Sequence, residues 1–290
     1  MTTPSYPSPP PSTARRDPQG APWPGLIPLR PLGIGDLFGA ALRLVRAHAA
    51  LLCLVALGGT VLGGAAVFGV LALLPDNSAY FDDQWTTQLA AGRFVLPPAA
   101  TVLPLLAGGL ISYITTIVVS GLATALIGDA SIGRPTGTRA ALDRLHGRWW
   151  VLIGVSVLVS LLVVIGFAAF VIPGFIVLAM LLHASPIVVL EKAGLGAALQ
   201  RSVQLTYGLR ARILGITVLA YLITSVISSA VLNLLPAAPT LSATVVALAV
   251  QAVISAFTVP WAASVIALLY VDTRIRKEGL AQSLVRSSMR

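Results

Sequence analysis

Residues 149–182 read WWVLIGVSVLVSLLVVIGFAAFVIPGFIVLAMLL and contain no charged side chain. A helix needs about 20 apolar residues to cross the hydrocarbon core of a bilayer, so this stretch is too long for one straight span. It is interrupted by Pro173-Gly174, a pair typical of turns. The stretch therefore predicts a tight hairpin of two membrane helices, and a re-entrant segment is the alternative.

The whole chain has the composition that this stretch suggests. Of its 290 residues, 57% are hydrophobic and 10% are charged, whereas a soluble domain carries about 25% charged residues. The net charge of +9 could indicate nucleic acid as a partner. The arginines instead flank apolar runs, which favours an anionic lipid surface, and we expect no nucleic-acid partner. The single cysteine, Cys53, excludes an internal disulfide.

We predict an all-α, polytopic six-helix transmembrane bundle within residues 31–279. The expected spans are at about 49–74, 98–128, 150–171, 173–190, 211–235 and 243–271. Residues 1–30 are rich in proline and lack periodicity, so we expect a disordered tail. Residues 280–290 are expected to form a flexible C-terminal tail. The first apolar run begins near residue 49 and is too long for a signal peptide, so no cleavage is expected.

The basic residues predict the orientation of the six spans. With an even number of spans, every lysine and arginine except Arg93 falls on one side of the membrane. Because loops rich in lysine and arginine stay in the cytoplasm, we expect both termini to be cytoplasmic.

A short basic pattern recurs before three of the spans. It reads GAALRLVRAH at 39–48, RAALDRLHGRWW at 139–150 and GAALQRSVQLTYGLR at 196–210. Its helical periodicity, with arginines opposite the apolar face, predicts amphipathic helices lying in the membrane interface. Trp149 and Trp150 fit the headgroup level. The expected contacts with anionic headgroups or a protein partner are Arg43, Arg46, Arg144, Arg148, Arg201 and Arg210.

An acid follows each pair of spans: Asp129, Glu191 and Asp272. A carboxylate at a helix C-terminus opposes the helix dipole, so we expect ion pairs with nearby interfacial arginines. The repeating unit is then a basic interfacial helix, a helix out, a helix back and an acid. Three such units predict a pseudo-threefold bundle; the alternative is that basic flanks look alike in any polytopic protein.

His183 is the ionisable residue that the sequence places near the middle of a span, close to Ser185. Ionisable groups inside a bilayer are costly and often functional. We therefore consider His183 and Ser185 an intramembrane polar site, the alternative being a neutral histidine bonded to a neighbouring serine or threonine.

Small polar side chains, most of them hydroxyls, form stripes on three spans, and glycines form a GxxxG pattern on the first. Such hydroxyls usually join helices, although they could line a polar path. Gly59 and Gly63 indicate close helix packing. The stripes are Ser112, Thr116, Ser120 and Thr124; Thr217, Tyr221, Thr224 and Ser228; and Gln251, Ser255 and Thr258.

The sequence lacks the usual catalytic patterns, including HExxH, GxSxG, CxxC and glycine-rich phosphate loops. We expect no enzyme activity, no cofactor and no metal. The first functional hypothesis is a membrane module whose cytoplasmic Arg/Trp belt binds anionic lipid or a partner. The alternative is a transporter or channel for a small or amphiphilic solute, using the polar helix faces and His183.

Three stretches resemble a known family: IPLRPLGIGDLFGAALRLVRAH at 27–48, IVVLEKAGLGAALQRSVQLTYG at 187–208 and LLYVDTRIRKEGL at 268–280. They are similar to bacterial polytopic membrane proteins of unknown function, related to the membrane domain of some glycerophosphoryl diester phosphodiesterases. The resemblance implies six membrane helices in the bacterial cytoplasmic (inner) membrane. The catalytic barrel of those phosphodiesterases is missing, so their hydrolase activity is not expected here.

Overall fold

The computed structural model describes residues 15–16, 22–23, 31–74, 87–88, 91–93, 98–131, 138–235 and 241–278. Most of the predicted N-terminal tail, and the predicted tail at 280–290, lie outside these ranges. Within the N-terminal tail, β1 (Arg15–Arg16) and β2 (Pro22–Trp23) form a short antiparallel ladder.

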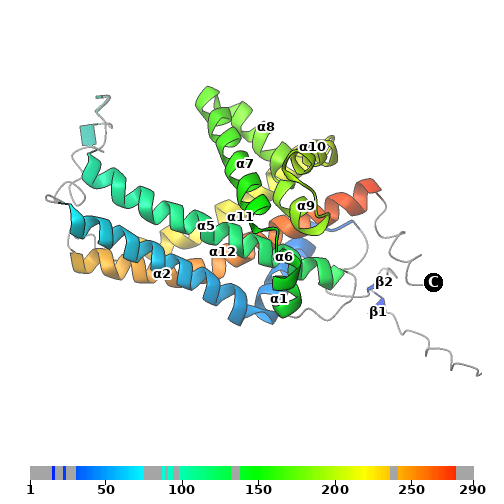
Figure 1. Ribbon diagram of the computed structural model, residues 1–290, viewed down its shortest axis with the longest axis horizontal. Helices are drawn as coiled ribbons and strands as arrows, with labels where there is room; N and C mark the ends of the chain where they lie inside the picture. The colour runs from blue at the N-terminus through cyan, green and yellow to red at the C-terminus, as the bar shows by residue number, and fades with distance from the viewer. Residues whose placement is uncertain are drawn as a thin grey trace, which may run out of the picture.

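The rest of the described chain is helical (Figure 1), which confirms the predicted fold class. Six segments are long and apolar enough to cross a membrane, with α8 and α9 together forming the fourth. The helices are α1 (Ile34–Ala47), α2 (Ala49–Leu73), α5 (Ala99–Ser131), α6 (Thr138–Leu145), α7 (Trp149–Ala169), α8 (Val171–Leu181), α9 (Ala184–Leu190), α10 (Leu195–Thr206), α11 (Arg210–Leu232) and α12 (Leu241–Glu278).

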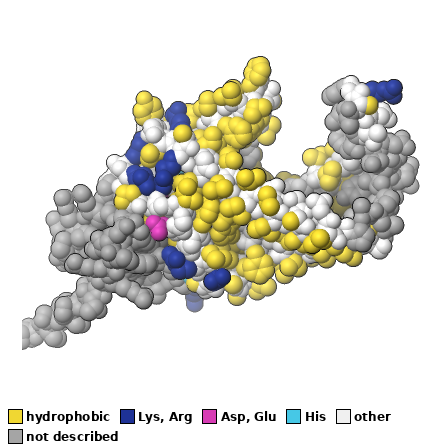
Figure 2. All heavy atoms as spheres, turned by 180° about the vertical axis from the view of Figure 1, so that it is seen from behind, with side chains coloured by type: hydrophobic (Ala, Val, Ile, Leu, Met, Phe, Trp, Pro, Cys, Tyr) yellow, Lys and Arg dark blue, Asp and Glu magenta, His cyan; other side chains and the backbone are white. Residues whose placement is uncertain are grey.

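The apolar surface of the molecule is large because most of each long helix faces outward. Only 22% of the apolar window is buried in α5, in α7 and in α11. Figure 2 shows hydrophobic side chains over much of the visible body, with most of the visible lysine and arginine in one region and one such side chain at the opposite end. Hydrocarbon can cover such a surface at no cost, whereas water cannot.

The hairpin of α7 and α8 forms, but its turn is not at Pro173-Gly174 as predicted. Phe170 makes the turn in an extended conformation (φ −168°, ψ 159°), and α8 already begins at Val171. A proline ring clashes with the carbonyl four residues earlier, which here belongs to Ala169, the last residue of α7. A Cβ added at Gly166 would lie 3.0 Å from Gly174 Cα, so these glycines let the two helices approach closely.

A second proline divides the fourth span. Pro186 has no N–H to offer the carbonyl of Leu182, and its ring disfavours a continuous helix there. The helix is accordingly interrupted at Leu182–His183, and His183 becomes the N-terminal flanking residue of α9.

The long helices form a ring in chain order, although α12 also packs across it on α5. The hairpins α2–α5, α7–α8 and α11–α12 each pack together, and α12 also packs on α2 and closes the ring. The amphipathic helices follow the same rule, since α6 packs on α5, α10 on α9 and α1 on α12. The ring is uneven: α2, α5 and α12 lie side by side while α7 and α8 lean away (Figure 1).

The glycines of the predicted GxxxG pattern lie where α2 and α5 meet. A Cβ at Gly59 would collide with Thr115, and one at Gly63 would lie 3.1 Å from Ser112 Oγ and 3.2 Å from the Gly108 carbonyl. The close contact between α2 and α5 is therefore possible only because Gly59 and Gly63 have no side chains.

Candidate functional site

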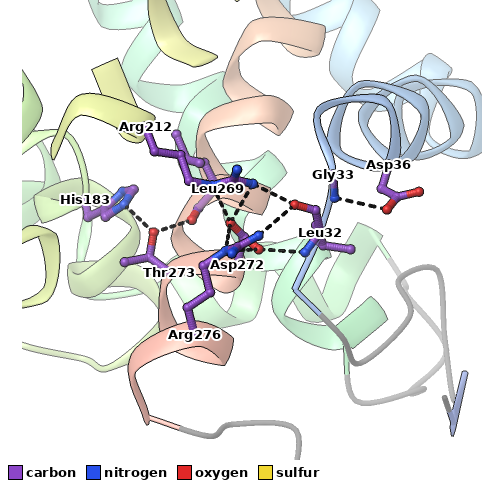
Figure 3. A network of polar contacts seen from close by, with 9 residues as sticks. All are labelled: Leu32, Gly33, Asp36, His183, Arg212, Leu269, Asp272, Thr273 and Arg276. Atoms are coloured by element: carbon purple, nitrogen blue, oxygen red, sulfur yellow. Dashed lines mark hydrogen bonds and ion pairs between the residues drawn. The ribbon is translucent and has the colours of Figure 1, made fainter. Parts of the chain in front are cut away.

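Asp272 is the centre of a buried polar cluster at the end of the bundle where α1 meets α12 (Figure 3). Its side chain is 1% exposed. It accepts hydrogen bonds from the Leu32 N–H at 2.7 Å and from Arg276 Nε at 2.9 and 3.0 Å, and it pairs with Arg212 Nη2 at 3.3 Å. We call this end of the bundle, which carries α1, α6, α10 and the end of α12, the basic end.

The same two arginines also hold the backbone of the segment before α1. The Leu32 carbonyl accepts hydrogen bonds from Arg212 Nη2 at 2.6 Å and from Arg276 Nη2 at 3.1 Å. Asp272 and the two arginines thus hold both the N–H and the carbonyl of Leu32. These contacts join the segment before α1 to α11 and α12, so the start of the helical part of the chain lies beside the end of its last span.

Glu191 forms a second cluster beside the first. Its carboxylate accepts hydrogen bonds from the Tyr270 hydroxyl at 2.7 Å and from Arg201 Nε at 3.2 Å. Arg274 Nε lies 3.8 Å from the same carboxylate and bonds Glu278 at 2.8 Å. Arg201 also pairs with Glu278. The cluster fastens α9 and α10 to the end of α12.

Arg201 is therefore a structural residue in this fold, and it is a poor candidate for a lipid contact. Burial alone would lower the pKa of its guanidinium, but hydrogen bonds to Glu191 and Glu278 and their negative charge outweigh burial and raise the pKa. Arg201 stays charged and occupied by two carboxylates. Its expected contact with a lipid headgroup stays a prediction, because the side chain is still 33% exposed.

The idea that each returning helix ends in an acid is only partly right. Glu191 does flank the C-terminus of α9, but α12 continues past Asp272 to Glu278 and α5 continues past Asp129 to Ser131. Asp272 does not oppose the end of a helix dipole, and its pairing with Arg276 is an i,i+4 contact within α12. The side chain of Asp129 lies outside the described part of the structure.

His183 lies beside the Asp272 cluster, within the fourth candidate span at 171–190. Its ring is fully buried, and Nε2 lies 3.1 Å from Thr273 Oγ1, one residue from Asp272 (Figure 3). The Tyr270 ring packs edge-on at 5.8 Å. Nδ1 has no partner among the described residues. Ser185 bonds Ser156 of α7 instead, so the structure does not join His183 and Ser185 into one site.

An open groove of about 500 Å³ lies between α6 and the end of α9. Its walls combine two cations with one carboxylate and an apolar floor. The lining residues are Ala140, Asp143, Arg144, Val189, Leu190 and Lys192. Lys192 is exposed and has a positive φ of 55°, the one such residue other than glycine in the described chain. Residues other than glycine rarely adopt this backbone conformation. At Lys192 it turns the chain from α9 towards α10.

The remaining predicted arginines have different surroundings. Arg43 and Arg46 are exposed on α1. Arg148 donates a hydrogen bond to the Lys192 carbonyl and so supports the wall of the groove. Arg210 lies over the Tyr207 ring, 5.6 Å from its centroid. Trp150 is 84% exposed, as expected for an interfacial tryptophan.

Sequence reasoning missed several residues that complete these clusters. The spacing of Asp272 and Arg276, four residues apart, is a signal for their pairing, whereas nothing local in the sequence indicates that Arg212 joins them. Tyr270 and Lys192 carried no local signal. Their roles depend on segments that are distant in sequence, namely α9 against α12 and α6 against α9.

The fold and these clusters define a multi-pass helical membrane protein with a basic, ion-paired end. Comparison with protein-family models, curated proteins and solved structures finds no match to this chain. Within the described residues no group of three or more histidine, cysteine, aspartate or glutamate side chains could hold a metal ion.

Proposed function

We propose that this chain is a non-enzymatic module of the bacterial cytoplasmic membrane that binds anionic lipid headgroups at its basic end. The basic end would face the cytoplasm, with both termini on that side. The groove between α6 and α9 carries the proposal, because it places Arg144 and Lys192 around an apolar floor.

The groove suits a phospholipid because it offers two kinds of surface at one place. A phosphate can contact the two cations, and the first methylenes of its chains can cover Ala140 and Leu190. Each lysine or arginine near an anionic membrane surface contributes about 1 kcal/mol. Asp143 lines the groove as well and reduces its net positive charge, so we expect moderate affinity and a marked dependence on salt.

The two exposed arginines of α1 extend the binding surface. Arg43 and Arg46 project from a helix that buries Leu37, Leu44 and Val45. Burial of these three apolar side chains fixes α1 on α12 and leaves the two arginines directed away from the core. This arrangement supports a role in attracting an anionic surface more than a role in folding. The resemblance to bacterial polytopic membrane proteins fits the proposal but names no ligand.

The test is native mass spectrometry of the purified full chain, titrated in detergent with phosphatidylglycerol or phosphatidylcholine. We expect several-fold preference for phosphatidylglycerol. The double variant Arg144→Gln/Lys192→Gln should lower its binding by about tenfold or more, from two contributions of about 1 kcal/mol each.

Arg93→Gln is the matched control, because it removes one positive charge from the connection between α2 and α5, outside the basic end. It should leave lipid binding unchanged. Equal binding of the two lipids, or an equal loss in the control, would refute the proposal.

The transporter alternative is favoured by one observation, a hydroxyl-lined pocket between α5, α11 and α12. A transporter would need this pocket to be reached from both sides of the membrane in turn. Uptake of a fluorescent fatty alcohol into proteoliposomes, compared with protein-free liposomes, would test it.

A further inference from the structure

A pocket of about 170 Å³ brings together hydroxyls from all three of the predicted stripes. Thr116 and Ser120 come from α5, Tyr221 and Thr224 from α11, and Thr258 from α12. Val259, Ala262, Ala263 and Ile266 complete the lining. Within the described residues these five hydroxyls form no bond between helices. Ser255 of the third stripe does join two helices, as such stripes predict, since its Oγ lies 2.8 Å from Thr60 Oγ1 of α2.

Three of the hydroxyls donate their hydrogen bond to a backbone carbonyl of their own helix. Thr116 Oγ1 donates to the Ser112 carbonyl at 2.9 Å and Thr224 Oγ1 to the Tyr221 carbonyl at 2.9 Å. Thr258 Oγ1 donates to the Ile254 carbonyl at 3.0 Å. A hydroxyl has one proton and two lone pairs, so each of these can still accept a hydrogen bond from a ligand.

The other two hydroxyls can donate. Tyr221 and Ser120 form no side-chain hydrogen bond within the described part of the chain, and Tyr221 is 52% exposed. One turn closer to the basic end, the buried Thr217 hydroxyl also lacks a partner among the described residues. The pocket therefore offers several acceptors and two donors, which complements a group that both donates and accepts.

The depth of the pocket excludes a charged ligand group. At a rise of about 1.5 Å per residue, the pocket hydroxyls of α5 and α12 lie about 14–21 Å from Asp129 and Asp272, near the middle of a hydrocarbon core of about 30 Å. The walls of the pocket carry no charged side chain. An ionised group at this depth would be costly without a partner of opposite charge.

The size and opening of the pocket indicate what enters it. A cavity of about 150 Å³ can hold a benzene molecule, so this pocket has room for a small headgroup and not for a whole lipid. Thr116 and Tyr221 are exposed at its edge. A bound molecule could therefore place its polar group inside and leave its chains in the bilayer.

We propose that this pocket binds the free hydroxyl group of a neutral membrane lipid, such as a diacylglycerol or a long-chain alcohol. The lipid hydroxyl donates to one of the threonine oxygens and accepts from Tyr221 or Ser120. This site is distinct from the anionic-lipid groove and does not depend on it.

The experiment is photolabelling of the full chain, reconstituted in phosphatidylcholine vesicles, with a diacylglycerol that carries a diazirine in its acyl chain. The matched probe is the same molecule with its hydroxyl acetylated, which removes the donor. We expect the diacylglycerol to label peptides of α5, α11 and α12 near the pocket, and the acetylated probe to label them at least about fivefold less, the effect of one hydrogen bond.

Variants separate specific binding from general exposure to lipid. Tyr221→Phe/Thr258→Val should reduce labelling by the diacylglycerol about tenfold while the melting temperature in detergent stays near that of the wild type. The control is Ser229→Ala on the same helix, whose exposed hydroxyl bonds its own backbone at Val226. Equal labelling by the two probes, labelling elsewhere on the helices, or no effect of the double variant would overturn the proposal.

Discussion

Asp272→Asn is the substitution that should reveal most about what holds the fold together. It keeps the size of the side chain and one oxygen for the Leu32 N–H, but it removes the charge that Arg212 and Arg276 share. Removing one partner of a buried ion pair costs about 3–5 kcal/mol. The arginine side chains are 31% and 28% exposed, so water recovers part of this loss. We expect a destabilisation of about 2–3 kcal/mol.

The effect can be measured by thermal unfolding of the full chain in detergent. For a chain of this size, a loss of 1 kcal/mol lowers the melting temperature by about 2–4 °C, so a decrease of about 5–10 °C is expected. Because Asp272 holds the segment before α1, limited proteolysis near Leu32 should also become faster.

Asp36→Asn is the matched control for this prediction. Asp36 lies in the first turn of α1, and its carboxylate bonds the exposed Gly33 N–H at 3.0 Å. The new amide keeps an oxygen for this N–H, so only the negative charge in the first helical turn is lost, which should cost about 0.3–1 kcal/mol. If the two variants lost the same stability, or if Asp272→Asn unfolded like the wild type, the central role of the Asp272 cluster would be wrong.

Two further substitutions test helix packing and the second cluster. Gly59→Leu should prevent close packing of α2 on α5 and reduce the monodisperse peak in size-exclusion chromatography, whereas Gly58→Leu, where an added Cβ meets nothing within 4 Å, should leave it unchanged. Tyr270→Phe should lower the stability by about 1–2 kcal/mol, measured by thermal unfolding, because a charge-assisted hydrogen bond to Glu191 is lost. An unchanged melting temperature would show that the Glu191 cluster does not need this hydroxyl.

The position of the hairpin turn illustrates where local reasoning stops. The sequence correctly indicates that residues 149–190 must fold back, because the apolar run exceeds the thickness of a bilayer. The turn falls at Phe170 because Pro173 acts on the carbonyl four residues earlier. The same rule, applied to Pro186, would have found the interruption at Leu182–His183 from the sequence alone.

His183 shows a different limit. Its position in the sequence suggests mid-membrane, but its depth depends on how far the fourth span slides along α12. That offset is fixed by long-range contacts, namely the bond of His183 to Thr273 and that of Tyr270 to Glu191. No periodicity within a single helix carries this information.

The sequence by itself determined that this chain is an all-helical membrane protein with six spans and basic interfacial helices. These features follow from the free-energy cost of exposing apolar side chains to water and unpaired backbone groups to lipid. This cost applies to each segment separately, so it can be read from the local sequence. Only the tertiary structure decided which arginines are bound to acids, where His183 lies and that three hydroxyl stripes meet in one pocket. Those features depend on how helices distant in the chain are offset and rotated relative to one another. Apolar helix surfaces are solvated equally well by lipid in many arrangements, so the hydrophobic pattern alone constrains the offset and rotation only weakly.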